Sequence, residues 1–198
     1  MTPRRHSAAG LALALLLTAS PAAAHPESPL VVRLLIGMEA RQATYIGEIW
    51  SFDAPTSAWL LDSFDADGSG AFEPAELPAL QAAVEQNVAP SVYLTRVFAA
   101  GAEAKPLKPY GFHASVASGT VSIAFALGLP APVAPGDVSV ELADPANFLA
   151  IQPVDGQPVV FRGATPGTCV PRLTLNAPDP RGEGGLVAVR LTLACAAP

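Results

Sequence analysis

The stretch DADGSGAFEPAE, residues 65–76, places oxygen-bearing side chains at the spacing that a bound divalent cation requires. Counted from the first aspartate, carboxylates stand at positions one, three, nine and twelve, a hydroxyl at five and a glycine at six. The glycine permits the sharp turn that presents the next backbone carbonyl, and the carboxylate at position twelve can bind through both oxygens. The expected ligands are Asp65, Asp67, Ser69, the carbonyl of Ala71, Glu73 and Glu76.

This pattern is that of an EF-hand loop, and oxygen ligands in this number favour Ca²⁺ over Mg²⁺. Ser69 departs from the usual Asp or Asn but keeps an oxygen. The alternative is a solvated acidic turn, in which clustered carboxylates repel one another and their pKa values rise. The sequence holds one such loop, so Phe72 at position eight must pack on the β domain or on another subunit. A single loop favours a structural site over a conformational switch.

Two histidines form a second, weaker candidate metal site. If the chain is cleaved before His25, its new amino group and ring nitrogen could chelate copper or nickel, with His113 as a further ligand. The alternative, which we favour, is that His25 only follows the cleavage site and His113 is a strand residue beside a turn. No cluster of cysteine and histidine supports the metal site.

The chain has two cysteines, Cys169 and Cys195, in two runs that read as a strand pair, CVPRLTLN and LVAVRLTLAC. If Leu173 faces Leu191 across this pair, the cysteines face each other as well. In an oxidising compartment this arrangement predicts a disulfide. A reactive thiol would need a nearby histidine or a C-x-x-C spacing, and the sequence has neither.

Catalytic motifs are missing from the sequence, and we expect no enzyme. There is no G-x-S-x-G, no H-E-x-x-H and no phosphate-binding glycine loop. Asp62 should face solvent on the helix before the acidic loop. Asp144 and Asn147, in the stretch ADPAN, are typical of a turn.

The first 24 residues read as a secretory signal peptide, with Arg4 and Arg5 before a short Leu/Ala-rich run and alanines before the expected cut. Residues 25–198 would then form a single exported domain. Of 11 basic residues, nine would remain against 17 acidic ones, a net charge of −8. This charge argues against nucleic acid or an anionic membrane surface as a partner and suits a cation.

Hydrophobic periodicity predicts a mainly β fold with one helical insertion. Short β runs bounded by Gly, Pro, Asp or Asn begin at Leu30, with a hairpin around 38–42, and continue from Tyr93 to the C-terminus. Between them, Asp53 can cap a short helix before the acidic loop, and EPAELPALQAAVEQN has helical spacing. We therefore expect an antiparallel β-sandwich-like domain with an EF-hand helix–loop–helix inserted at about 54–88.

Several short motifs, in this order, make the chain similar to an exported bacterial family, domain of unknown function 1007. They are AHP at 24–26, WSFD at 50–53, LLDSFDADGSGAFEPAEL at 60–77, ADPANFLA at 143–150, and Cys169 with Arg172 and Leu173. The resemblance implies a periplasmic location, and members are sometimes labelled the periplasmic component of an ABC-type transport system. The family typically has HPH at the mature start, whereas this chain has His25-Pro26-Glu27.

The sequence thus predicts a periplasmic calcium-binding accessory protein, serving a metal or other ABC-type transport system, with a membrane transporter as partner. The second hypothesis is a nickel, cobalt or copper carrier or sensor that uses His25. Metal content would separate the two.

Overall fold

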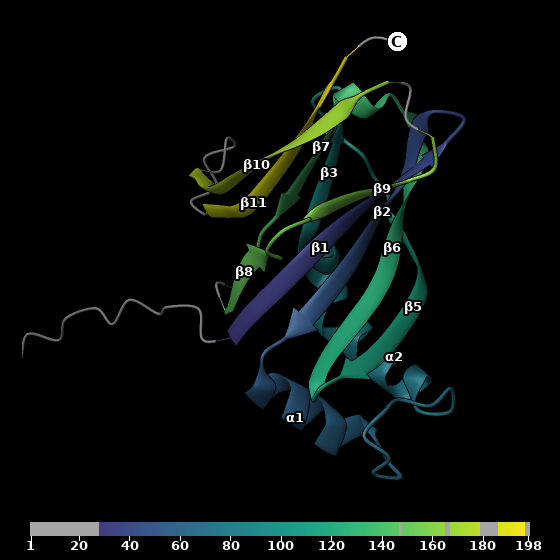
Figure 1. The fold of residues 1–198 in the computed structure, drawn as a ribbon, viewed down its shortest axis with the longest axis vertical. Helices are drawn as coiled ribbons and strands as arrows, with labels where there is room; N and C mark the ends of the chain where they lie inside the picture. Colours follow the sequence, from purple (N-terminus) through teal and green to yellow (C-terminus); the bar gives the residue numbers. More distant parts are fainter. Residues whose placement is uncertain (1–27, 147, 165–166, 179–185, 197–198) are drawn as a thin grey trace, which may run out of the picture.

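The computed structural model describes residues 28–146, 148–164, 167–178 and 186–196. The expected signal peptide and His25 lie outside these ranges. The described chain forms a six-stranded and a five-stranded β-sheet and two α-helices, so the mainly β expectation is confirmed (Figure 1). Neither helix in these ranges has the length and apolar character required to cross a membrane.

Four long strands make up most of the first sheet, in the order β5-β6-β2-β1. β1 and β2 form one antiparallel hairpin, and β5 and β6 form another. Antiparallel pairing of β2 with β6 joins the two hairpins into one sheet. The strands are β1 (Ser28–Glu39), β2 (Gln42–Phe52), β5 (Lys108–Ala117) and β6 (Thr120–Val133). The predicted first hairpin is confirmed. Its turn is shorter than the polar stretch 38–42 expected to form it. Ala40 and Arg41 both have positive φ, 46° and 65°, so the strands continue to either side of them.

The outer edge of β1 departs from the expected antiparallel arrangement. The strands β8 (Leu149–Pro153) and β9 (Val159–Arg162) both pair with β1 in parallel, one after the other along its length. The chain reaches this edge from the second sheet by a crossover, and crossovers rather than hairpins connect parallel neighbours.

The second sheet has the order β10-β11-β7-β3-β4. Its strands are β10 (Cys169–Pro178), β11 (Leu186–Cys195), β7 (Val138–Leu142), β3 (Thr95–Ala99) and β4 (Ala102–Glu103). The predicted register of the last hairpin is confirmed, with Leu173 opposite Leu191 and Cys169 opposite Cys195. The two cysteines form a disulfide.

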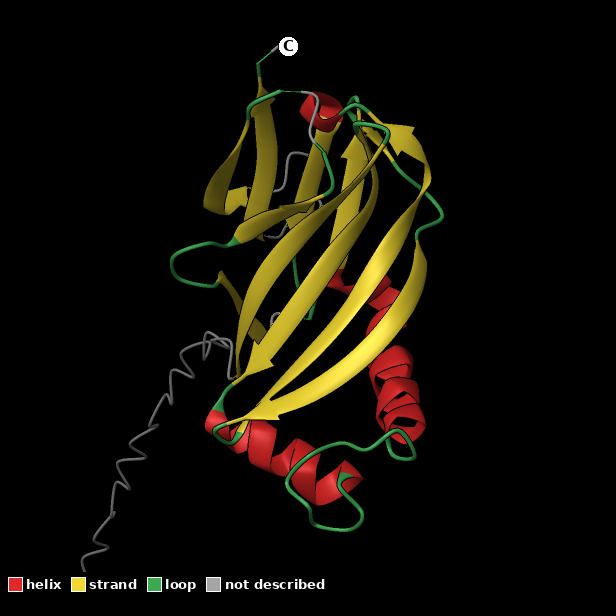
Figure 2. Cartoon of the chain, turned by 45° about the vertical axis from the view of Figure 1, so that its right-hand side comes forward, coloured by secondary structure: helices red, strands yellow, loops and turns green. Residues whose placement is uncertain are grey.

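The two helices, α1 (Ala54–Phe64) and α2 (Leu77–Val88), lie at the end of the long strands that is opposite the C-terminus (Figures 1 and 2). A 3₁₀ segment, η1 (Ala89–Leu94), follows α2, and a shorter one, η2 (Pro135–Asp137), precedes β7. As predicted, Asp53 caps α1, and its Oδ1 accepts from the amide of Thr56 at 3.0 Å. The buried Ser57 hydroxyl ties α1 to the sheet, because it donates to the carbonyl of Phe52 and accepts from the amide of Val121 at 3.0 Å.

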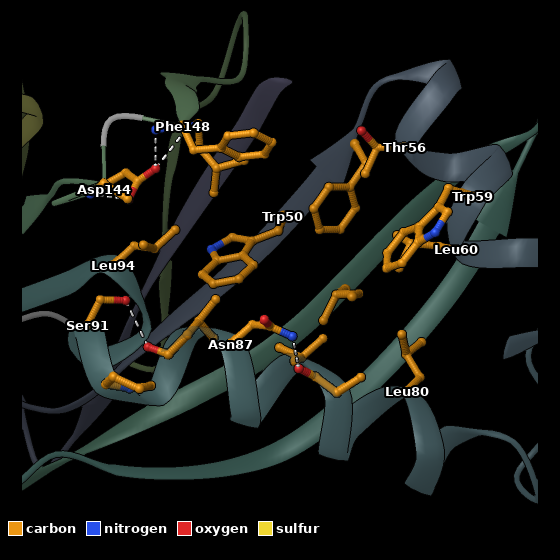
Figure 3. A pocket seen from close by; sticks show the side chains of 18 of the residues that line it. Trp50, Thr56, Trp59, Leu60, Leu80, Asn87, Ser91, Leu94, Asp144 and Phe148 are labelled. Carbon is orange, nitrogen blue, oxygen red and sulfur yellow. Dashed lines mark hydrogen bonds between the residues drawn. The ribbon is translucent and has the colours of Figure 1, made fainter. Parts of the chain in front are cut away.

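The helices do not close tightly over the first sheet. A cavity of about 570 Å³ remains between α1, α2, η1 and the strands β2 and β6 (Figure 3). Buried Trp50 and Ile123 project from these strands toward it.

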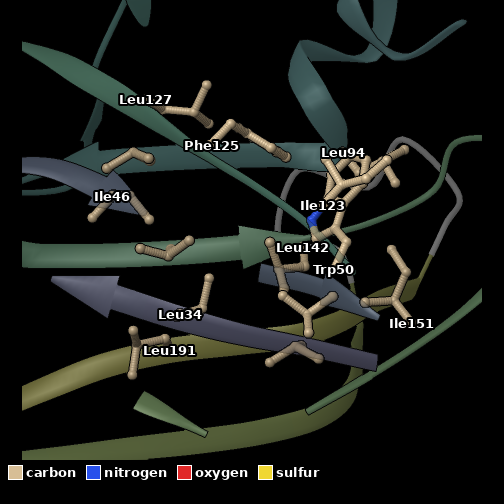
Figure 4. Close-up of a cluster of buried hydrophobic side chains, with 14 of the residues drawn as sticks. Leu34, Ile46, Trp50, Leu94, Ile123, Phe125, Leu127, Leu142, Ile151 and Leu191 are labelled. Carbon is tan, nitrogen blue, oxygen red and sulfur yellow. The ribbon is translucent and has the colours of Figure 1, made fainter. Parts of the chain in front are cut away.

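Apolar side chains of both sheets belong to one hydrophobic core (Figure 4). Leu34, Ile46 and Ile123 contribute from the first sheet, and Leu142 and Leu191 from the second. Each such buried side chain stabilises the folded state by about 1.5–3 kcal/mol relative to exposure. The core therefore gives the helices a rigid base on which to hold the acidic loop.

Candidate metal site

The loop between the two helices brings four carboxylates together. One oxygen from each of Asp65, Asp67, Glu73 and Glu76 lies within 4.8 Å of the others. Among the described residues, these four carboxylates form the group of metal-ligating side chains whose oxygens lie close enough together to hold one metal ion. Helix α1 ends one residue before Asp65 and α2 begins one residue after Glu76, so the first and last expected ligands stand at the helix ends.

Backbone amides of the loop orient the carboxylates at both ends. The two oxygens of Asp65 accept from the amides of Ser69 and Gly70 at 3.0 and 2.8 Å. The two oxygens of Glu76 accept from the amides of Ala66 and Glu73 at 2.6 and 3.0 Å. Both oxygens of Glu76 therefore face the loop, which is the orientation that bidentate binding requires.

Gly68 and Gly70 supply the turn that makes these contacts possible. Their φ angles are +70° and +82°, a region that glycine enters without steric cost. Gly70, at position six, makes its turn in this region, and its amide reaches back to Asp65.

The loop lowers the pKa values of the carboxylates at its two ends. The Gly70 amide chiefly lowers the pKa of Asp65, and the Glu73 amide chiefly lowers the pKa of Glu76. The expectation that clustering raises these pKa values is wrong for both residues. Donated hydrogen bonds favour the charged form more than the loss of hydration in the loop opposes it. Both groups are therefore held in the ionised form that a cation binds.

The middle of the loop contains a buried oxygen without a partner. Glu73 Oε1 accepts from the hydroxyl of Ser69 at 2.9 Å, whereas its Oε2 is buried and has no hydrogen-bond partner among the described residues. A buried carboxylate oxygen without a donor is costly, and a cation would relieve that cost. Of the six expected ligands, four converge as carboxylates. Ser69 donates to three of them, through its hydroxyl to Glu73 and through its amide to Asp65 and Asp67. Ala71 contributes an amide to the Ser69 hydroxyl at 3.3 Å, and its carbonyl stays a prediction.

Phe72, at position eight, is 9% exposed and belongs to the hydrophobic core of this chain. The expectation that it packs on the β domain or on another subunit is thereby resolved in favour of the same chain. A loop braced by its own core needs no second loop.

The other candidate residues do not form a second site in the described chain. His113 is exposed on β5, and its proposed partner His25 lies outside the described residues. Asp62 is exposed on α1, as expected. Asp144 acts as a turn residue, as expected, since it accepts from the amides of Ala146, Phe148 and Leu149 at 2.7–2.9 Å. Asn147 lies outside the described residues.

The sequence interpretation missed a buried carboxyl group, Glu48, on β2. Its Oε2 accepts from the indole of Trp50 at 2.7 Å, and its Oε1 lies 2.5 Å from the hydroxyl of Thr95 on β3. Burial raises the pKa of Glu48 to about 7. The signal was present, because Glu48 has the same parity along the strand as the core residues Ile46 and Trp50.

Comparison with known proteins gives one match. A protein family described as "Protein of unknown function (DUF1007)" matches residues 10–193. No curated protein and no solved structure matches the chain.

Proposed function

This chain belongs to the DUF1007 family, and from its acidic loop we propose that it is a calcium-binding accessory protein of the periplasm, with the ion held in a single EF-hand. The observation that carries the proposal is the convergence of Asp65, Asp67, Glu73 and Glu76 between two helices. We propose a binding role rather than a catalytic one.

The chemistry of the loop favours Ca²⁺ among the divalent cations. All its candidate ligands are oxygens, and the bidentate carboxylate at the twelfth position is the group that widens the site beyond the octahedron preferred by Mg²⁺. Transition metals prefer imidazole nitrogen and thiolate sulfur as ligands, and among the described residues no histidine or cysteine belongs to this cluster. The unpartnered Glu73 Oε2 is the group that would gain most from the ion.

An extracytoplasmic location is supported by the disulfide Cys169–Cys195, because such bonds persist in oxidising compartments. Extracellular modules bind Ca²⁺ with Kd values of about 10⁻⁴–10⁻³ M, which suits a site that is filled structurally rather than switched. A role beside a membrane transport system follows from the family resemblance, and we include it in the proposal on that ground.

Titration calorimetry with the exported protein tests the site. We expect one Ca²⁺ per chain and a higher melting temperature in Ca²⁺ than in chelator, because an ion bound only by the folded state stabilises it by mass action. Excess Mg²⁺ should compete only weakly with Ca²⁺ for the loop.

Variants of the loop locate the ion. Glu76→Gln removes the charged bidentate ligand and should weaken Ca²⁺ binding by about tenfold or more. Ser69→Ala should weaken binding less, since water can replace one hydroxyl. Asp62→Asn is the matched control, because it neutralises an exposed carboxylate on α1 outside the cluster. If several millimolar Ca²⁺ neither binds nor stabilises, or if Glu76→Gln matches Asp62→Asn, the loop is an acidic turn.

A further inference from the structure

The cavity beside the helices is lined mainly by apolar side chains from six separate parts of the chain (Figure 3). Trp50 and Ile123 come from the sheet, Trp59 and Leu60 from α1, and Leu80 from α2. Leu94 and Phe148 close it from η1 and from the segment before β8. None of these side chains belongs to the acidic loop.

The cavity has a buried floor and an exposed apolar rim. Trp50 is 3% exposed, and Leu80 and Ile123 are fully buried. At the rim, by contrast, Trp59 is 60% exposed and Phe148 is 54% exposed. Large aromatic side chains left in water beside an apolar hollow are a common sign of a binding surface. The volume of about 570 Å³ lies within the range of about 300–1,000 Å³ that small-molecule sites occupy.

The charges of the lining restrict the ligand. Among the described residues that line the cavity, Asp144 is the one with an ionisable side chain, and its carboxylate already accepts hydrogen bonds from three backbone amides. These described lining residues include no lysine, arginine or histidine. An anionic group entering it would therefore lose its hydration without gaining a counter-ion. Thr56 and Asn87 offer neutral polar groups instead.

The size of the cavity argues against a helical peptide. A helix is about 10–12 Å across and rises about 5.4 Å per turn, so one turn occupies about 400–600 Å³. The cavity would hold one such turn. An extended peptide would bury its own amides and carbonyls against a wall that is almost entirely carbon, at a cost for each unpaired group.

From these observations we propose that the cavity is a binding site for an uncharged small molecule with a hydrocarbon or aromatic body. The apolar body lies between the helices and the face of β2 and β6. A neutral hydroxyl or similar group on the ligand remains at the rim, near Thr56 and Asn87.

Fluorescence tests this site directly, because both tryptophans of the chain, Trp50 and Trp59, line it. The probe is N-phenyl-1-naphthylamine, an uncharged aromatic molecule whose emission rises in apolar surroundings. We expect saturable binding with energy transfer from tryptophan to the probe. Added 1-decanol should displace the probe, and decanoate at the same concentration and neutral pH should displace it at least about tenfold less well.

A pair of alanines in α2 gives matched variants. Ala83 lines the cavity, whereas its neighbour Ala82 is exposed and does not. Ala83→Phe fills part of the cavity and should weaken probe binding about tenfold, and Ala82→Phe should leave it unchanged. Trp59→Ala, at an exposed position, should also weaken binding and keeps the test valid if Ala83→Phe does not fold. Equal binding by Ala83→Phe and Ala82→Phe with both folded, wild-type binding by Trp59→Ala, or decanoate binding as tight as that of decanol, would overturn the proposal.

Discussion

At the scale of the single residue, Glu48 joins the two sheets through a shared hydrogen-bond chain. The Thr95 hydroxyl lies 2.5 Å from Glu48 Oε1 and 3.0 Å from the carbonyl oxygen of Tyr93. One hydroxyl hydrogen cannot serve both oxygens. If Glu48 is protonated, its carboxyl group donates to Thr95 and Thr95 donates to Tyr93, which satisfies every member of the chain. The geometry and the raised pKa therefore agree.

Protonation of Glu48 should make the free energy of unfolding depend on pH. The pKa is about 7 in the folded protein against 4.5 for the unperturbed group, so between these values the folded state holds a proton that the unfolded state has lost. Stability attributable to this group is present below about pH 4.5 and is lost as pH rises through about 7, by about 3 kcal/mol in total. Glu48→Gln should remove this loss, which urea unfolding from pH 5 to 8 would measure.

The matched control for Glu48→Gln is Glu39→Gln, an exposed position at the end of β1. That variant should keep the wild-type fall in stability with pH. A Glu48→Gln variant with the wild-type slope would show that the folded protein holds Glu48 as a carboxylate throughout.

At the scale of the element, the C-terminal hairpin depends on its covalent link. The disulfide joins residues 26 apart in sequence and stabilises the fold chiefly by restricting the unfolded chain, by about 3 kcal/mol. Exported protein that is denatured without reduction should therefore show no free thiol. Cys169→Ser combined with Cys195→Ser should lower the free energy of unfolding by about this amount. Two reactive thiols per chain would contradict the assignment.

Elements that depend on neighbouring residues were predictable from sequence. The Asp53 cap, the glycines of the acidic loop and the register of β10 with β11 follow from local spacing and turn chemistry. The parallel pairing of β8 and β9 with β1 was not predictable in the same way. It joins segments more than 100 residues apart, and no short-range pattern specifies which edge they occupy.

The acidic loop and the apolar cavity differ in how far the sequence predicts them, and for the same reason. The carboxylates of the acidic loop come from twelve consecutive residues, so their spacing alone identified them. The apolar cavity collects Trp50, Leu80, Ile123 and Phe148, which are scattered over the chain and resemble ordinary core residues in sequence. Only the packing of α1 and α2 on the first sheet distinguishes the cavity from the core.

At the scale of the whole molecule, the acidic loop and the cavity share the same two helices. The loop connects the end of α1 to the start of α2, and both helices form walls of the cavity. A cation that draws Asp65 and Glu76 onto one centre fixes the separation of those helix ends. We expect the same separation to affect the width of the cavity, because Phe64 at the end of α1 and Leu80 near the start of α2 both line it. Binding at one site should therefore change the affinity of the other, and by the same factor in both directions.

We accordingly expect Ca²⁺ to tighten the binding of the naphthylamine probe, and saturating 1-decanol to tighten the binding of Ca²⁺, each by about fivefold or more. Probe titrations in saturating Ca²⁺ and in chelator, with calorimetric Ca²⁺ titrations with and without decanol, measure the two factors. In Glu76→Gln the probe affinity should no longer respond to Ca²⁺, while Asp62→Asn, which leaves the cluster intact, should respond as wild type does. Probe affinity that is the same in Ca²⁺ and in chelator would mean that the core of the sheet, rather than the loop, sets the spacing of α1 and α2. In that case each site binds its ligand independently of the other.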